Sequence, residues 1–390
     1  MQNTDVALKT CKEYCYEQVL QALKDSIDLL GGIAEFVKPN QTVLIKPDLY
    51  YATEPNQAKT TNPNVVSALA EIIAKAGGKC IIADSPKGNF NLSTMDNVYV
   101  KTQMLEASNN GNAILNVNEN ITTITNPKGE FCRDIYIMDA INDADIIINV
   151  GKFKCDKNLG IIGCSQNLFG LIPGKFKDLI KSRCYTSKAY YNYIIDLYEA
   201  LENKVVLNIL DGIVSCEANG DPRILNSIIV GQNPYSVDAV ALKIINQHPD
   251  KDMMLNESVR RGKFNFDFNI LGDNVEPMIC CDFNYSAPLS TIKRGSDKYF
   301  KKEYNTYQKR PVIQSKTCKG CKVCIDVCPM RAISIKHGKL GEYAKIDRNK
   351  CVSCFKCVDN CPYKIIKTKT PLKYMPIDKM LKKSNQRRTK

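Results

Sequence analysis

Two cysteine-rich runs near the end of this 390-residue chain constrain its fold more than any other feature. Each run has the form Cys-x2-Cys-x2-Cys-x3-Cys-Pro, and the two copies occupy residues 318–329 and 351–362. A [4Fe–4S] cluster needs four thiolates, and a loop with a cysteine at every third position supplies three of them. The cysteine before the proline then reaches across to the other cluster. The pattern therefore predicts two [4Fe–4S] clusters.

This exchange of the fourth cysteine predicts a ligand set for each cluster. The first set is Cys318, Cys321, Cys324 and Cys361. The second set is Cys328, Cys351, Cys354 and Cys357. Zinc ribbons would use two cysteine pairs per metal and would leave the three-plus-one run unexplained. A disulfide framework is disfavoured because no apolar secretory segment follows Met1 and the other cysteines show no regular spacing.

Residues 311–369, which contain both runs, resemble a bacterial two-cluster ferredoxin domain, and every ligand position of that family is matched. The apolar residues that follow each run, 332–335 and 364–366, fit the short strands that cover such clusters. We expect this small α+β domain to follow an α/β domain of residues 1–285 and a basic linker of residues 286–310. A basic tail of residues 370–390 is expected to end the chain.

The formal net charge is +13, and most of the excess basic residues lie in the linker and the tail. The basic residues between 382 and 390 have no interleaved aromatic side chains, so nucleic acid is not an expected partner. A solvated tail, or a tail that docks on a membrane surface or an acidic partner, remains open. No apolar run approaches the roughly 18 residues of a membrane span. The 18 cysteines fit a reducing, cytoplasmic and anaerobic setting.

Short aliphatic runs alternate with helical patterns in the first 285 residues, which predicts an α/β fold with a mostly parallel sheet and flanking helices. The runs are residues 43–45, 80–83, 145–150, 205–210 and 228–230. The clearest helix lies between the first two runs, with Asn62 as its N-cap and Pro63 at its first position. Further helices are expected over residues 14–30 and 236–245.

Polar residues follow these strands, where ligands bind in open α/β sheets because helix N-termini and short loops meet there. We assign general acid–base roles to Lys46, Asp84, Lys152 and Asp211. We assign substrate binding to Thr61, Ser85, Lys154, Asn167, Gly170, Glu217 and Asn219. The alternative is that each residue only forms a turn or caps a helix. That alternative poorly explains lysines that come directly after apolar strands.

The stretch between Gly151 and Gly174 places several glycines close to lysines. Such a backbone can approach an anionic ligand, for example a phosphate or a carboxylate, without side chains in the way. Neither a Walker loop nor a GxGxxG motif is present. Cys155, Cys164 and Cys216 are expected in loops at the same end of the sheet, so a third metal or a redox-active thiol is one interpretation and buried structural cysteines are the other.

Several of these segments resemble the family called domain of unknown function 362, whose members are also known as iron–sulfur centre proteins. The resemblance lies in residues 43–47, 60–63, 83–86, 167–174, 211–220 and 237–239. Asp48 stands where members usually have asparagine, and residues 154–156 replace an expected Lys-Thr-His, which weakens any proposal of a histidine base there. Because the family has no agreed activity, the resemblance implies a fold and a site but no reaction.

Two functions follow from these patterns. In the first, the chain is an iron–sulfur oxidoreductase that receives electrons from a redox partner protein or another low-potential donor. It passes them singly to a small anionic substrate or cofactor in the α/β domain, and covalent tethering raises the effective concentration of donor at acceptor. The alternative is a non-catalytic electron-transfer or assembly partner with a docking domain. A non-redox enzyme with structural or regulatory clusters is a third interpretation.

Overall fold

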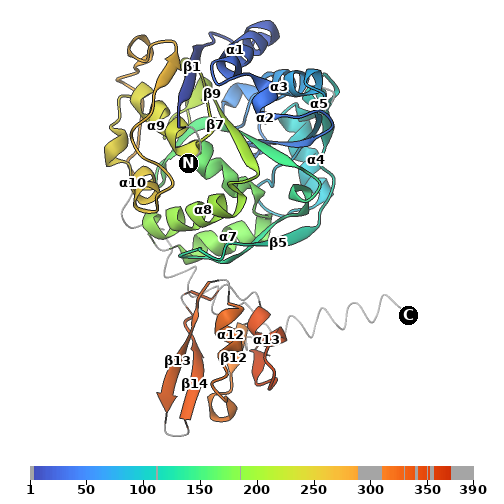
Figure 1. Cartoon of the computed structure of the whole chain (residues 1–390), viewed down its shortest axis with the longest axis vertical. Coiled ribbons are helices and arrows are strands. Elements are labelled where there is room, and N and C mark those ends of the chain that lie inside the picture. The colour runs from blue at the N-terminus through green and yellow to red at the C-terminus, as the bar shows by residue number, and fades with distance from the viewer. Residues whose placement is uncertain are drawn as a thin grey trace, which may run out of the picture.

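The computed structural model describes residues 4–110, 113–184, 186–288, 310–328, 330–338, 341–348, 350–351 and 355–369. An α/β region up to residue 288 is followed by a small C-terminal region that begins at residue 310 (Figure 1). The predicted linker and tail lie almost wholly outside the described residues, so the predicted domain boundaries stay predictions. Within the described ranges, no helix has the length and apolar character needed to cross a membrane.

One mixed sheet organises the α/β region. In the described residues its strand order is β11-β1-β10-β9-β7-β2-β3-β4, with β8 paired to β7. The strands are β1 (Val6–Thr10), β2 (Thr42–Pro47), β3 (Lys79–Ile82), β4 (Ala113–Leu115), β7 (Ile146–Asp156), β8 (Gly160–Ile162), β9 (Val205–Cys216), β10 (Pro222–Gly231) and β11 (Ile270–Gly272). The central strands β9, β7, β2, β3 and β4 are parallel, whereas β10 is antiparallel to both β9 and β1. The expected mostly parallel α/β fold is confirmed.

Helices cover both faces of this sheet and create two apolar cores. One core contains α1 (Tyr16–Asp28), α2 (Ile33–Phe36), α3 (Pro63–Lys75), α4 (Leu92–Lys101) and α5 (Met104–Asn110). The other contains α6 (Cys164–Asn167), α7 (Gly174–Arg183), α8 (Ser187–Leu201), α9 (Pro234–Ile244) and α10 (Met253–Arg260), together with the hairpin of β5 (Ile121–Thr125) and β6 (Asp134–Met138). Successive strand residues alternate between the cores, as the period of two requires: Leu44 belongs to the second and Val43 and Ile45 to the first.

Local sequence accounts for several helix starts. Asn62 caps α3 by accepting the N–H of Asn64, and Pro63 occupies its first position, as expected. Helix α9 begins two residues earlier than expected because Asn233 caps it through the N–H of Tyr235. The structure also adds β1 ahead of α1, a strand that the sequence analysis missed.

Strands β7 and β9 extend through segments that the sequence analysis placed in loops. β7 continues through Lys152 and Lys154, and β9 continues through Asp211 to Cys216. Lys152 lies opposite Asp211 in the register of the two strands. Opposite charges on neighbouring strands stabilise each other, so these polar residues do not end the strands.

The C-terminal region consists of short strands around a small core. β12 (Arg310–Ile313) pairs with β15 (Ile366–Lys369), and β13 (Ile333–Gly338) pairs with β14 (Gly341–Ile346), both antiparallel. The short helices α12 (Val323–Asp326) and α13 (Lys356–Asp359) each contain a cysteine of one run. Strand β13 includes residues 333–335 of the first expected strand, whereas β15 begins at Ile366 and shares only that residue with the expected 364–366. The core beneath the two strands includes Cys324, Cys357 and Cys361.

Candidate functional site

A cavity of about 130 Å³ lies at the carboxyl ends of β2, β3 and β7. Four of the predicted site residues line it: Asp84, Lys154, Asn167 and Gly170. Residues that the sequence analysis did not select complete the wall, above all Tyr50, Tyr51, Tyr190, Lys177 and Lys181. The cavity therefore combines aromatic rings with several charged groups.

Lys46 and Asp84 form a fully buried ion pair behind this cavity. The Nζ of Lys46 lies 2.8 Å from Oδ1 of Asp84 and donates to Oδ1 of Asn167 at 3.0 Å. The other carboxylate oxygen of Asp84 accepts the N–H of Leu49. A Cβ at Gly170 would collide with both Lys46 and Asp84, so only glycine lets this backbone pass.

Lys154 pairs with a residue that the sequence analysis noted only as a departure from the family pattern. Its Nζ lies 2.5 Å from Oδ2 of Asp48 and donates to the carbonyl of Lys59. Thr61 supports this arrangement from behind, because its hydroxyl accepts the N–H of Asp48 and donates to the carbonyl of Val150. Thr61 does not line the cavity, so its position indicates a structural role.

Lys177 and Lys181 reach the cavity from one face of α7, as residues four apart on a helix do. Lys177 is fully buried, and its Nζ donates to the carbonyl of Ser85 and lies 5.4 Å from the centre of the Tyr50 ring. Burial lowers the pKa of Lys177 to about 7, the charge of Asp84 opposes this shift, and the positive charges of Lys46 and Lys181 add to it. Lys181 lies 4.7 Å from the centre of the same ring.

Lys152 and Asp211 form a second buried pair that does not line the cavity. Nζ of Lys152 lies 2.9 Å from Oδ2 of Asp211, and the Tyr14 hydroxyl contacts both groups, at 2.6 and 2.7 Å. Asp211 also accepts the N–H of Asn62 at the start of α3. Burial lowers the pKa of Lys152, whereas the charge of Asp211 opposes that shift. The four residues proposed for acid–base chemistry thus fall into two separate pairs.

The other predicted binding residues lie elsewhere. Glu217 pairs with Arg223 at 3.1 Å in the β9–β10 hairpin, and Asn219 is exposed in its turn. Ser85 contributes its backbone carbonyl to Lys177. The structure therefore does not bring Glu217, Asn219 or Thr61 to the cavity wall.

The three cysteines expected together at the sheet end do not form a metal site. Cys155 and Cys216 lie in β7 and β9 rather than in loops, and the thiol of Cys164 donates to the carbonyl of Ile209. Burial raises the pKa of all three thiols. Among the described residues, no three His, Cys, Asp or Glu side chains are placed to hold a single metal ion.

In the C-terminal region, one pocket is lined by Cys318, Cys321, Cys324 and Cys361. These four residues are the first predicted ligand set, and Cys361 reaches it from the second run. The N–H of Ala344 points at the sulfur of Cys318, at 3.4 Å. Four converging sulfurs with a backbone N–H donor fit a [4Fe–4S] cluster, which takes one thiolate at each iron.

Three members of the second predicted ligand set are described. Cys328 accepts the N–H of Ala332 on its sulfur at 3.2 Å, and Cys357 is buried in α13. Cys351 packs, with Cys328, against the apolar cluster in which Met330 and Ala332 join the core of the α/β region. Cys354 lies outside the described residues, so this ligand set stays a prediction.

Lys177 and Lys181 lie in helix α7 and follow no strand, whereas Tyr50 and Tyr51 follow β2 but were not selected with the charged residues there. Tyr190 lies in a tyrosine-rich helix, α8, and was assigned to helix packing. The spacing of Lys177 and Lys181, one helical turn apart directly after the glycine-rich stretch, is the signal that could have indicated them.

Comparisons with known proteins agree with this division of the chain. Residues 43–243 match the family described as domain of unknown function DUF362, and residues 317–365 match a 4Fe-4S dicluster domain. A thylakoid-associated protein of Synechocystis sp. is 29% identical over 255 residues, which are 63% of this chain and 75% of that protein. The lactate racemase apoprotein of Thermoanaerobacterium thermosaccharolyticum aligns with a TM-score of 0.37 and 16% identity, over 60% of this chain and 56% of that one. The family match spans more than half of the sequence, and this chain belongs to the DUF362 family and carries a 4Fe-4S dicluster domain after it.

Proposed function

We propose that this chain is an oxidoreductase that reduces a small anionic substrate or bound cofactor in the cavity of its α/β domain. The 4Fe-4S dicluster domain makes the chain an iron–sulfur electron-transfer protein. When bound, such clusters supply electrons one at a time. The two cysteine sets, Cys318, Cys321, Cys324 with Cys361 and Cys328, Cys351, Cys354 with Cys357, are the proposed ligands of two clusters.

The observation that carries the proposal is the placement of Lys177. Its ammonium is fully buried at a cavity wall, and it has no carboxylate within ion-pair distance among the described residues. A buried cation without a counter-ion is costly. An anionic ligand would supply the missing negative charge, and Lys181 and Lys154 lie on the same wall to strengthen its binding.

The cavity also limits what can bind. Its volume of about 130 Å³ lies below the roughly 300–1,000 Å³ of pockets for drug-sized ligands. The ligand is therefore a compact anion, such as a small carboxylate or a phosphate monoester. The rings of Tyr50, Tyr51 and Tyr190 shape the apolar side of the space.

Lys177 can also act in proton transfer. A pKa near 7 lets its Nζ hold or release a proton at neutral pH, which suits a general acid during reduction. Lys46 and Asp84 hold each other in place beside it and fix the shape of the wall.

The test starts from anaerobic protein that has been reduced and freed of excess reductant. Small carboxylates that contain a carbonyl or a C=C bond, and phosphate esters, are added one at a time, and reoxidation is followed by the loss of the reduced-cluster EPR signal. At least one compound is expected to reoxidise the wild-type protein and to react much more slowly with Lys177→Met. Lys157→Met, an exposed lysine outside the cavity wall, is the matched control. Reoxidation only by an acceptor protein, unaffected by Lys177→Met, would favour the carrier function instead.

A further inference from the structure

The two predicted cysteine sets differ in what surrounds them. Next to Cys328, the guanidinium of Arg331 donates to the carbonyls of Gly129 and Glu130 in the α/β region. Met330 and Ala332 are buried in the same apolar core as α8 and β6. This side of the C-terminal region is therefore attached to the β5–β6 hairpin and the turn that joins its strands (Figure 1).

Helix α13 adds a second contact on the same side. Nζ of Lys356 lies 3.5 Å from Oδ2 of Asp134 and 5.4 Å from the centre of the Tyr136 ring, both in β6. Tyr136 in turn stacks on Phe176 of α7, with ring centres 4.5 Å apart. Cys328 and Cys351 pack against the same apolar cluster as β6 and α8, so this side of the second cysteine set faces the α/β domain. Lys177, next to Phe176, lines the cavity.

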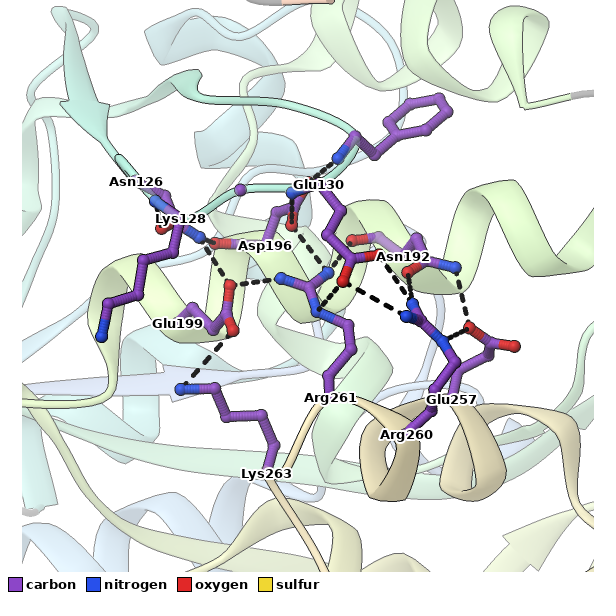
Figure 2. A network of polar contacts seen from close by, with 12 residues as sticks. Asn126, Lys128, Glu130, Asn192, Asp196, Glu199, Glu257, Arg260, Arg261 and Lys263 are labelled. Atoms are coloured by element: carbon purple, nitrogen blue, oxygen red, sulfur yellow. Dashed lines mark hydrogen bonds and ion pairs between the residues drawn. The ribbon is translucent and has the colours of Figure 1, made fainter.

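The turn that receives Arg331 is held firmly. The carboxylate of Asp196 accepts the N–H groups of Glu130, Phe131 and Cys132 at 2.6–2.9 Å. Arg261 pairs with Asp196 at 2.7 Å and also contacts Glu199, as Figure 2 shows. The buried network therefore gives Arg331 a firmly held turn to bind.

The other cysteine set is open to solvent at one member. Cys321 is exposed, and its pocket is also lined by Lys319 and Lys322. Two more exposed lysines, Lys316 and Lys364, lie within two or three residues of Cys318 and Cys361. Among the described residues no carboxylate lines this pocket, and none of the four lysines forms an ion pair. We call these four lysines, together with Cys321, the outer face.

We propose that the outer face is the docking surface for an acidic electron-carrier protein. The inference rests on the proposed function, because it assigns the point where electrons enter. In each encounter the reduced carrier loses one electron and this domain gains one. The inner side already contacts the α/β domain, and among the described cysteines of the two sets Cys321 is the exposed one, so a second protein can come closest to a cysteine sulfur at the outer face.

The charge of the outer face selects the class of partner. Unpaired lysines create a positive potential that steers an acidic surface toward Cys321 and speeds association at low ionic strength. The exposed ring of Tyr363, which also lines the pocket, provides apolar contact beside these charges.

The experiment measures the rate of reduction of the anaerobic full-length protein by stopped flow. The probe is a reduced plant-type [2Fe–2S] ferredoxin, an acidic carrier of low potential, and dithionite serves as a small reductant that needs no docking surface. The variant Lys319→Glu/Lys322→Glu is compared with Lys336→Glu/Lys345→Glu, which reverses two exposed charges on β13 and β14.

We expect Lys319→Glu/Lys322→Glu to slow reduction by ferredoxin about tenfold or more at low salt and to flatten its salt dependence. The control pair should change this rate little, and dithionite should reduce all three proteins equally. If the first variant loses iron, Lys316→Glu/Lys364→Glu takes its place with the same expectation.

Equal ferredoxin rates in wild type and variants at every salt concentration would overturn the proposal. Failure of reduced ferredoxin to reduce the wild-type protein, while dithionite succeeds, would also overturn it. Neither result bears on Lys177, so a failure of the proposed function shows up separately, as unchanged reoxidation of Lys177→Met by small anions.

Discussion

Three buried lysines show how differently one residue type can be stabilised in a single sheet end. Lys46 has Asp84 and Asn167 as partners, and Lys152 has Asp211 and Tyr14. Lys177 has only a backbone carbonyl and the face of Tyr50. Burial of a charge without a partner favours the neutral form, so the pKa of Lys177 falls to about 7. Among the described residues, Lys177 is thus the one of the three without a carboxylate within ion-pair distance.

The affinity for small anions should therefore depend on pH. Lys177 is protonated below its pKa of about 7, and the ammonium form binds anions, so affinity should fall as the pH rises through about 7. Because a bound anion favours the ammonium form, the midpoint should move upward when the site is filled. Calorimetric titration with acetate at pH 6 and pH 8.5 checks this. Lys177→Met should bind weakly at both values, and a wild-type affinity that is the same at both would contradict the assignment.

Gly170 sets a second requirement at the residue scale. Its Cβ would collide with Lys46 and Asp84, so Gly170→Ala should break the buried pair and lower the free energy of unfolding by about 3–5 kcal/mol. Chemical denaturation measures this loss. Gly262→Ala is the control, because Gly262 has a φ of 66° but open space around it, and alanine there should cost only about 1–2 kcal/mol. Similar losses of stability in both variants would show that the Lys46–Asp84 pair can move to make room for the added methyl group.

At the scale of elements, β7 and β9 hold charged residues inside the strands rather than in the loops that follow them. The pairing of Lys152 with Asp211 keeps both strands regular through charged positions. A buried charge also supports the turn between β5 and β6. There the carboxylate of Asp196 on α8 accepts backbone N–H groups that have no partner strand. Burial raises the pKa of Asp196, and the N–H donors and Arg261 oppose this shift.

Asp196→Ala should therefore loosen the β5–β6 turn. The change leaves three N–H groups and the buried Arg261 without the carboxylate, and we expect a loss of about 3–5 kcal/mol in the free energy of unfolding. Hydrogen exchange over residues 126–138 should become faster. Glu202→Ala, which removes a half-exposed partner of Lys263, should cost no more than about 1 kcal/mol. An unchanged hydrogen-exchange rate in Asp196→Ala would show that the turn is stable without this carboxylate.

At the scale of the whole molecule, the two regions differ in how they are stabilised. The α/β region has an apolar core on each face of its sheet, whereas the core of the C-terminal region is small and half of its buried members are cysteines. Small domains with so little apolar burial usually need metals or cross-links. The C-terminal region should thus depend on its clusters, while the α/β region should not.

Iron and acid-labile sulfide analysis tests this difference. The anaerobic full-length chain should hold about eight irons, and a chain that ends at residue 288 should hold none while keeping its helical circular dichroism. Removal of iron from the full chain should speed hydrogen exchange in residues 310–369 only. Iron retained by the shortened chain would place a metal in the α/β region and reopen the roles of Cys155, Cys164 and Cys216.

The sequence alone determined the features that short-range chemistry dictates. The convergence of Cys318, Cys321 and Cys324 with Cys361 follows from cysteine spacing, the start of α3 from Asn62 and Pro63, and the α/β class from alternating patterns. Only the tertiary structure decided that β10 runs antiparallel to β9 and that Lys46 and Lys152 belong to two separate ion pairs. It also decided that Lys177 and Tyr190 line the same cavity. These features depend on which distant segments pack together. Burial by those segments lowers the pKa of Lys177 and leaves its ammonium without a carboxylate within ion-pair distance among the described residues.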